Sequence, residues 1–170
     1  LKALKATGKP LIVVYIEGRP LDKNWASENA DAVLTAYYPG QEGGIAIADV
    51  LFGDFNPAGR LPFSVPRSVG QIPLYYNKKA PQSHDYVEMS ASPLYPFGYG
   101  LSYTTFGYSD LKISKPVIGP QENITLSCTV KNTGKKAGDE VVQLYIRDDF
   151  SSVTTYDKVL RGFERICLPS

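Results

Sequence analysis

Two short apolar runs mark the first third of the chain. Residues 11–16, LIVVYI, form a continuous apolar and β-branched run, and residues 32–38, AVLTAYY, form a second. Runs of this length without polar alternation are typical of strands buried on both faces of a parallel sheet. The first run stops at Gly18 and Pro20, which interrupt regular structure. The pattern therefore predicts two buried parallel strands.

Segments of helical spacing separate and follow these runs. A short helix is expected over 24–29, where Asp22 or Asn24 can cap the first turn. Apolar positions at helical spacing predict a second helix over 41–52, with Gly53 as its C-cap. The order strand, helix, strand, helix predicts an α/β arrangement with right-handed crossovers.

The apolar period changes to two from residue 106 onward. Alternating segments with turn signals between them predict four strands, at 105–114, 123–134, 139–148 and 158–168. Strands of this length and spacing indicate a β-sandwich of immunoglobulin type. Such a sandwich needs about seven strands, so the one predicted here is incomplete.

The region between these two patterns has three parts. Residues 54–76 are rich in Pro and Gly and are expected to form turns and short extended pieces. Residues 77–94 are polar and predict a long loop, which in a compact protein is either functional or disordered. The aromatic segment YPFGYGLSYTTF, 95–106, lies where the period changes. Because aromatic side chains bury large areas, it is expected to pack the two regions against each other.

Composition and charge exclude several classes of partner. The 170 residues are 43% hydrophobic and 21% charged, with a formal net charge of +1. No lysine cluster indicates nucleic acid or an anionic membrane as partner. No apolar run approaches the roughly 20 residues that span a bilayer. With a single histidine and no metal-ligand spacing, no metal or cofactor is expected.

The cysteines and the chain ends add two expectations. Alternation places Cys128 on the apolar face of its strand, pointing inward, and Cys167 opposite the apolar face of another, which disfavours a disulfide. Leu1 and Leu4 resemble the last turns of an amphipathic helix, and the chain closes within a strand pattern. The sequence is therefore expected to be a piece of a longer protein, and its lack of a signal peptide says nothing about location.

Four long motifs carry a family resemblance. In chain order they are GKPLIVVYIEGRPL, YYPGQEGGIAIADVLFGDFNPAGRLPFSVPRSVGQIPLYYN, PLYPFGYGLSYTTF and VKNTGKKAGDEVVQLYIRD. They resemble the C-terminal portion of family 3 glycoside hydrolases, and among these the β-glucosidases most of all. The resemblance implies an enzyme built from a (β/α)8-like barrel, an α/β sandwich domain and a fibronectin type III-like domain.

The resemblance also implies a division of this chain. Residues 1–76 would be the C-terminal half of the α/β sandwich domain, 77–105 a long loop and aromatic connector, and 106–170 the N-terminal part of the fibronectin type III-like domain. The expected fold class is therefore α/β followed by all-β. A partial α/β sandwich, with parallel strands and helices, is joined to an incomplete immunoglobulin/fibronectin type III-like β-sandwich.

The family's reacting carboxylates are expected to lie outside this sequence. Members use a retaining mechanism, with a nucleophile and an acid/base roughly 5–5.5 Å apart. The resemblance puts the nucleophilic Asp in the barrel and the acid/base Glu shortly before the strand equivalent to 11–16, ahead of Leu1. No position here inherits a catalytic role, so the chain alone is expected to be inactive.

Three residues are candidates for contact with substrate. Glu17 follows the first predicted strand, at the carboxyl end where open α/β sheets gather ligands. In the long loop, Tyr86-Val87-Glu88 resembles a Tyr-x-acid pattern that related enzymes carry near the active-site mouth. A tyrosine ring can stack on the CH groups of a sugar, and a carboxylate can accept a hydrogen bond from a hydroxyl. These residues would line the substrate rim.

Two other residues receive structural interpretations. His84 stands beside Asp85 in the same loop, but no Ser or Cys nucleophile motif accompanies the pair, and a lone loop histidine is expected to be solvated. Trp25 is the sole tryptophan. Its place in the helical segment favours burial in the core over stacking on a sugar.

The predicted function is part of a retaining β-glucosidase that hydrolyses terminal non-reducing β-D-glucosyl residues. One alternative keeps the chemistry and changes the sugar, to a β-xylosidase or α-arabinofuranosidase, since the barrel supplies most glycone specificity. Another is a non-catalytic carbohydrate-binding or adhesion module. The expected partners are an oligosaccharide or β-glucoside substrate and the N-terminal barrel of the full-length enzyme. A periplasmic or secreted location is favoured for that parent.

Overall fold

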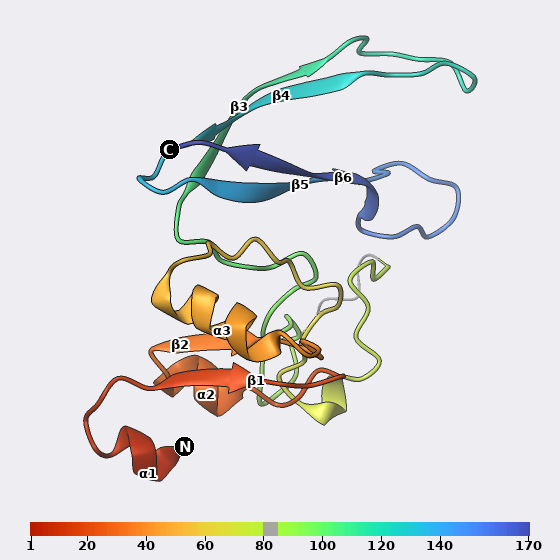
Figure 1. The fold of residues 1–170 in the computed structure, drawn as a ribbon. Coiled ribbons are helices and arrows are strands. Elements are labelled where there is room, and N and C mark those ends of the chain that lie inside the picture. The colour runs from red at the N-terminus through yellow and green to blue at the C-terminus, as the bar shows by residue number, and fades with distance from the viewer. Residues whose placement is uncertain (80–84) are drawn as a thin grey trace. The chain divides into compact units, whose positions relative to one another are not determined.

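The computed structural model describes residues 1–79 and 85–170, and contacts divide the chain into two units. Unit 1 consists of Leu1–Phe55, Arg60–Gly100 and Gln143–Phe163, and unit 2 of Asn56–Gly59, Leu101–Val142 and Glu164–Ser170. Each unit is therefore assembled from three separate stretches of the chain, whose course can be followed by colour in Figure 1.

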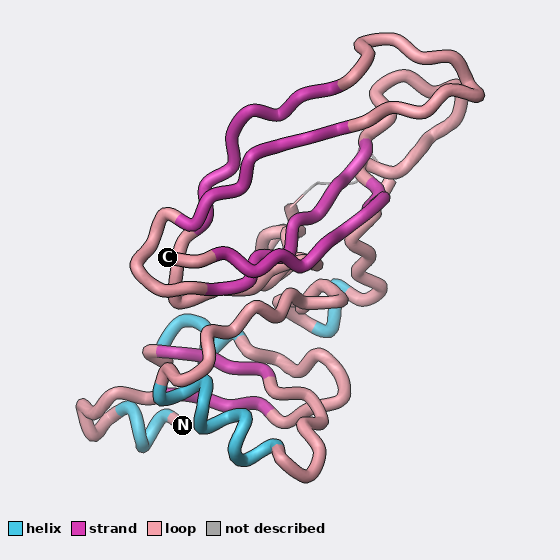
Figure 2. The backbone as a smooth tube through the Cα atoms, turned by 45° about the horizontal axis from the view of Figure 1, so that its top comes forward, coloured by secondary structure: helices cyan, strands magenta, loops and turns pink. Residues whose placement is uncertain are grey.

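The helices are short and the strands pair in twos. The helical elements are α1 (Lys2–Lys5), α2 (Asn24–Asn29), α3 (Gly43–Phe52) and the 3-10 turn η1 (Val69–Gln71). The strands are β1 (Ile12–Tyr15), β2 (Ala32–Thr35), β3 (Phe106–Ile113), β4 (Leu126–Asn132), β5 (Gly138–Ile146) and β6 (Val159–Leu168). Within the described residues they pair as β1–β2, β3–β4 and β5–β6, and Figure 2 shows these strands in magenta.

Strands β1 and β2 form the parallel pair that the apolar runs predict. Val13 lies opposite Val33, and α2 connects the strands and packs against β2. Leu11, Val13 and Ala26 are buried at the centre of this β-α-β arrangement, with Trp25 packed against them. The predicted parallel pairing is confirmed, and Trp25 lies half-buried against this core, on the side that its sequence position favours. The predicted burial on both faces is wrong, because Ile12 is 49% exposed, and β2 ends at Thr35 instead of Tyr38.

Helix α3 agrees closely with the helix predicted over 41–52. It ends at Gly53, whose backbone is left-handed with φ 86°. The Gly53 N–H donates to the carbonyls of Asp49 at 3.1 Å and Val50 at 3.2 Å. Glycine adopts a positive φ without a steric penalty, so Gly53 is the C-cap that the sequence predicts.

The cap of helix α2 differs from both predicted alternatives. Lys23 occupies the N-cap position and makes no hydrogen bond there with its side chain. Asp22 lies one residue earlier, and its Oδ1 accepts from the backbone N–H of Asn24 at 2.9 Å. Asp22 thus satisfies a free N–H of the first turn without being the N-cap, and Lys23 is left to point elsewhere.

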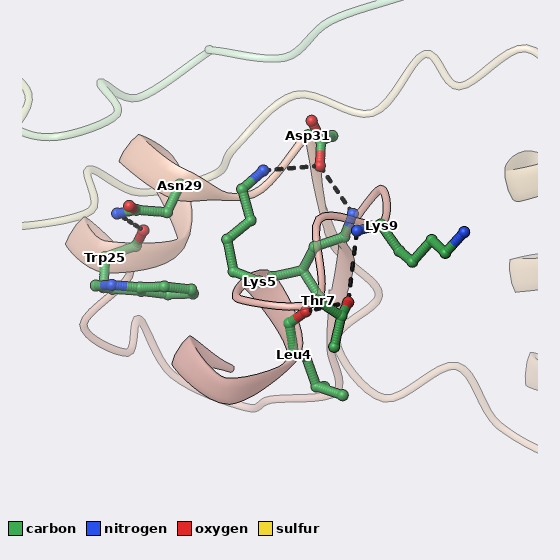
Figure 3. Close-up of polar contacts among 8 residues, drawn as sticks. Leu4, Lys5, Thr7, Lys9, Trp25, Asn29 and Asp31 are labelled. Atoms are coloured by element: carbon green, nitrogen blue, oxygen red, sulfur yellow. Dashed lines mark hydrogen bonds and ion pairs between the residues drawn. The ribbon is translucent and has the colours of Figure 1, made fainter.

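A polar contact ties the N-terminal helix to the first strand. Asp31 Oδ2 accepts from the backbone N–H of Leu11 at 2.8 Å and from Nζ of Lys5 at 3.0 Å, in the group of contacts drawn in Figure 3. The Leu11 N–H, and then the Lys5 ammonium, hold the pKa of Asp31 below its ordinary value. Asp31 therefore joins α1, the start of β1 and the end of α2 within unit 1.

The first half of the aromatic segment is bound to an earlier stretch of unit 1. Tyr95 forms an antiparallel bridge with Val65, and the Leu61 N–H donates to the Tyr99 carbonyl at 2.8 Å. The Gly98 N–H returns a bond to the Leu61 carbonyl at 2.7 Å. The Tyr95 and Tyr99 rings stack with centroids 5.2 Å apart. This part of the segment is thus held by backbone pairing as well as by ring contacts; its role in packing the two regions together stays a prediction.

Unit 2 contains the antiparallel β3–β4 pair and a polar contact centred on Asn56. Asn56 Oδ1 accepts from the Ser102 hydroxyl at 2.9 Å and from the Tyr103 N–H at 2.8 Å. Its Nδ2 donates to the Ala137 carbonyl at 2.9 Å. A single amide therefore joins Asn56–Gly59 to two places within Leu101–Val142 that are far apart in the sequence.

The four strands predicted after residue 106 are all present. Strands β5 and β6 pair with each other, and Arg165 Nε donates to Asp139 Oδ2 at 2.6 Å near one end of the pair. The Arg165 guanidinium, and then the Cys167 thiol, hold the pKa of Asp139 below its ordinary value. The change of period at 106 is thus a correct signal of β structure.

The inward orientation expected for Cys128 is wrong. Cys128 and Cys167 are both free and exposed. Pairing between β3 and β4 passes from Ser109 opposite Thr129 to Lys112 opposite Ser127, so a bulge in β3 faces Cys128. At such a bulge two residues of one strand, here Asp110 and Leu111, oppose a single residue of the other, here Cys128.

Candidate functional site

Glu17 lies just beyond the carboxyl end of β1, as predicted, but it is buried. The residue is 5% exposed, and its backbone N–H donates to the Tyr37 carbonyl at 3.2 Å. Its carboxylate forms an ion pair with the Lys23 ammonium and accepts from the Thr35 hydroxyl at 3.4 Å. The end of β2 and the N-cap of α2 therefore each supply a partner to this carboxylate.

Two tyrosines flank the ion pair. The Lys23 ammonium lies 4.3 Å from the centroid of the Tyr15 ring. Burial, and then the charge of Glu17, raise the pKa of Tyr15 and of Tyr37. Glu17 Oε2 and the Tyr37 hydroxyl are buried and have no hydrogen-bond partner within residues 1–79 and 85–170. Contact of Glu17 with a substrate stays a prediction.

Tyr86 and Glu88 lie in an exposed turn of unit 1. Tyr86 is 48% exposed, Val87 is fully exposed and Glu88 is exposed. Asp85 closes this turn: its Oδ1 accepts from the Ala91 N–H at 2.8 Å. The two side chains are therefore free to meet a ligand, and their place at a substrate rim stays a prediction. His84 lies outside the described residues.

The described polar contacts do not bring the three candidates together. Glu17 bonds to Lys23 and Thr35, and no described hydrogen bond or ion pair joins it to Tyr86 or Glu88. The candidates thus differ in their surroundings: Glu17 is buried against a cation, whereas Tyr86 and Glu88 are exposed.

Gln71 is a residue that the sequence interpretation missed. It is 4% exposed, and its side chain accepts a hydrogen bond from the Arg67 backbone N–H. The same side chain donates to the carbonyls of Ser90 and Ser92, in the loop that carries Tyr86 and Glu88. A glutamine in a Pro- and Gly-rich stretch gives no periodic signal. Its role is visible only once the loop is placed beside it.

A cavity of about 370 Å³ lies in the connection between β5 and β6. Its lining is polar and includes Arg147, Ser151 and Thr155. Arg147 Nε lies 2.7 Å from Asp149 Oδ1, and its Nη1 lies 3.8 Å from Asp157 Oδ1, so this one cation is shared between two carboxylates of the loop. Within the described residues, no group of three or more His, Cys, Asp or Glu side chains could hold a metal ion. The same part of the chain contains no helix long and apolar enough to span a membrane.

Comparison with family models gives the class of protein to which this α/β piece and the strands after it belong. The model of the glycosyl hydrolase family 3 C-terminal domain matches residues 1–103. The model of the fibronectin type III-like domain matches residues 140–170. The chain belongs to glycosyl hydrolase family 3.

Individual relatives agree with this assignment. The chain is 49% identical to the periplasmic β-glucosidase of Salmonella typhimurium, over 99% of the chain and 23% of that protein. It is 47% identical to a β-xylosidase of Formosa agariphila, over 99% of the chain and 24% of that protein. The solved structure of the β-glucosidase EmGH1 from Erythrobacter marinus superposes with a TM-score of 0.95 at 48% identity, over 99% of the chain and 22% of that structure.

The chain spans about a quarter of the length of these relatives. It corresponds to the C-terminal part of a glycoside hydrolase, as the family resemblance predicts. The relatives include both β-glucosidases and β-xylosidases, so family membership alone leaves the sugar open.

Proposed function

We propose that the parent protein is a retaining β-glucosidase that releases terminal non-reducing β-D-glucosyl residues. The observation that carries the proposal is the 49% identity, along 99% of this chain, to a relative named as a periplasmic β-glucosidase. The similarity to the solved β-glucosidase of Erythrobacter marinus, with a TM-score of 0.95, supports the same activity.

The chemistry requires two carboxyl groups that this chain is not expected to supply. A retaining glycosidase uses one carboxylate as nucleophile and a second carboxyl group as acid and then base. In our proposal both come from parts of the parent other than these 170 residues. Residues 1–76 would complete an α/β sandwich domain, 77–105 would connect the domains, and 106–170 would begin a fibronectin type III-like domain. The chain alone would be inactive.

Tyr86 and Glu88 would form part of the rim around the substrate. Both are exposed on one turn of unit 1, where an aromatic face and a carboxylate stand two residues apart. Such a pair can stack on a sugar and accept a hydrogen bond from a hydroxyl group. Glu17 belongs to the proposal through its place at the end of β1, but its burial against Lys23 makes the exposed pair the better candidates.

A β-xylosidase is the second candidate. The specific observation in its favour is the 47% identity to the Formosa agariphila β-xylosidase, over 99% of this chain. A xyloside lacks the hydroxymethyl group of a glucoside, and we attribute that discrimination to the barrel. A periplasmic or secreted location for the parent is proposed from the name of the Salmonella relative.

The test is an assay of the full-length parent protein with p-nitrophenyl β-D-glucoside and p-nitrophenyl β-D-xyloside. We expect the glucoside to give the higher kcat/KM, and NMR of the first product formed to show the β-anomer. A higher kcat/KM for the xyloside would favour the second candidate, and an α-anomer would contradict the retaining mechanism. The 170-residue chain in the same assay should show no turnover.

A further inference from the structure

The turn that carries Tyr86 and Glu88 is closed by a side chain of its own. Asp85 Oδ1 accepts from the Ala91 backbone N–H at 2.8 Å and from the Ser90 hydroxyl at 3.2 Å. A carboxylate acceptor makes such bonds stronger than a neutral one does. The Asp85 carboxylate therefore holds together the two ends of a short turn whose middle projects Tyr86, Val87 and Glu88 to the outside.

The far end of the same turn is fixed by a buried amide. Gln71 is 4% exposed, and its Oε1 accepts from the Arg67 N–H at 2.6 Å. Its Nε2 donates to the Ser90 carbonyl at 3.1 Å and to the Ser92 carbonyl at 3.4 Å. Arg67 Nε adds a bond to the Ser92 carbonyl at 3.1 Å. Every polar atom of the Gln71 amide is thus used, and two of its bonds go to the turn.

The stretch that carries Gln71 is itself held by burial and backbone hydrogen bonds. Val65 is 1% exposed, and its carbonyl accepts from the Leu94 N–H at 2.8 Å, two residues after the last contact of the Gln71 amide. Gln71 itself ends the 3-10 turn η1, and the N-cap of that turn is Ser68, whose hydroxyl accepts from the Gly70 N–H at 3.2 Å. The turn 85–92 is therefore attached to a well-packed stretch.

We propose that Asp85 and Gln71 are positioning residues that hold the turn 85–92 in the conformation in which Tyr86 and Glu88 meet the substrate. This proposal rests on the rim role of that pair in the proposed function. Ordering a backbone residue costs about 1–2 kcal/mol, and a loop that is ordered beforehand does not pay this on binding. Asp85 and Gln71 act through the turn, without touching the sugar.

The test uses the full-length parent protein and p-nitrophenyl β-D-glucoside. Asp85→Ala removes the acceptor that closes the turn, and we expect KM to rise roughly fivefold with kcat within about twofold of the wild type. Asp85→Asn keeps the Oδ1 acceptor and should restore most of the affinity. Gln71→Met, similar in length but without the amide, should raise KM in the same direction. Unchanged KM in Asp85→Ala, with Tyr86→Ala raising it, would overturn the proposal.

A matched control separates positioning from general damage. Ser68→Ala removes the acceptor of the Gly70 N–H in the same 3-10 turn but no described bond to the loop, so its KM should equal that of the wild type. Limited proteolysis should cut segment 85–92 faster in Asp85→Ala and Gln71→Met than in Ser68→Ala. Equal cutting in all three would contradict the positioning role. Since Asp85 is exposed, its variant tests the proposal even where Gln71→Met fails to fold.

A double variant distinguishes this proposal from failure of the proposed function. If Asp85 acts through Tyr86, Asp85→Ala adds little to KM once Tyr86→Ala is present, whereas independent effects multiply. Multiplying effects would overturn the positioning role. A wild-type parent without glycosidase activity would contradict the proposed function instead. An unchanged KM in both Tyr86→Ala and Glu88→Gln would contradict the role of these two residues at the substrate rim and, with it, this inference.

Discussion

The side chains of Glu17 and Lys23 form an ion pair in which each is only 2% exposed. Water is excluded from both charges, so each depends on the other and on the polar groups around them. The Thr35 hydroxyl lies 3.4 Å from the Glu17 carboxylate and donates a hydrogen bond to it. The centroid of the Tyr15 ring lies 4.3 Å from the Lys23 ammonium. The relationship joins the end of β1 to the start of α2.

Replacing Lys23 with methionine should destabilise the protein by about 3–5 kcal/mol, because it leaves the Glu17 carboxylate buried without a cation. Urea unfolding of the full-length protein measures the change. The double variant Glu17→Leu with Lys23→Met removes both charges and should recover most of the loss. A single Lys23→Met variant as stable as the wild type would show that the carboxylate finds another partner.

Asp31→Asn should lower stability at neutral pH and not in acid. The pKa of Asp31 is held below its ordinary value of 3.8, mainly by the Leu11 N–H and then by Lys5. The charged carboxylate therefore stabilises the folded chain above that value, and the contribution is lost as the pH falls through the lowered pKa. Unfolding free energies of wild type and variant, measured from pH 7 downward, should converge. A difference that grows in acid would contradict this assignment.

Gly53→Ala should destabilise the protein by about 1 kcal/mol, because the C-cap of α3 has φ 86° and an alanine is strained there. Thermal unfolding is a sufficient measurement. Gly44→Ala is the matched control: it lies in the same helix, and a Cβ at that position meets nothing within 4 Å. We expect the control to be neutral or slightly stabilising, and equal losses in both would indicate a cause other than backbone strain.

Asn56→Ala should cost about 1–3 kcal/mol, because it removes the bonds to Ser102, Tyr103 and Ala137 together. Asn56→Asp keeps an oxygen acceptor for Ser102 and Tyr103 and loses the donor to the Ala137 carbonyl. Its loss should therefore be smaller than that of the alanine variant. Hydrogen exchange at the Tyr103 amide gives a local readout. We expect its protection to be kept in Asn56→Asp and reduced in Asn56→Ala. Equal protection in the two variants would contradict the role of the Asn56 oxygen.

Helices and strands with a strong local pattern could be predicted from the sequence, whereas the side-chain contacts that these elements make could not. The helix over 41–52 and its end at Gly53 follow from apolar spacing and from the backbone freedom of glycine, both of which are local properties. The N-cap of α2 was missed because Asp22 and Asn24 are equally good caps by residue type, and Lys23 took the position while its ammonium went to Glu17. Here the N-cap residue bonds to a carboxylate six residues earlier and makes no side-chain capping bond.

The candidate site shows the same division. Tyr86 and Glu88 could be proposed from the sequence because a Tyr-x-acid pattern occupies three consecutive residues. Gln71 could not, because its importance comes from the Ser90 and Ser92 carbonyls, about twenty residues away along the chain. Glu17 was proposed for the right place, the carboxyl end of β1, but its burial depended on the approach of Lys23.

By itself the sequence determined the order of the elements, the change from α/β to β structure at 106, and the family, because periodicity and motifs are carried by neighbouring residues. Only the tertiary structure decided which polar groups meet: Lys23 with Glu17, Asn56 with Ala137, and Gln71 with the turn of Tyr86. It also decided that Cys128 is exposed. Such encounters depend on how distant segments approach each other, and no local pattern encodes that approach.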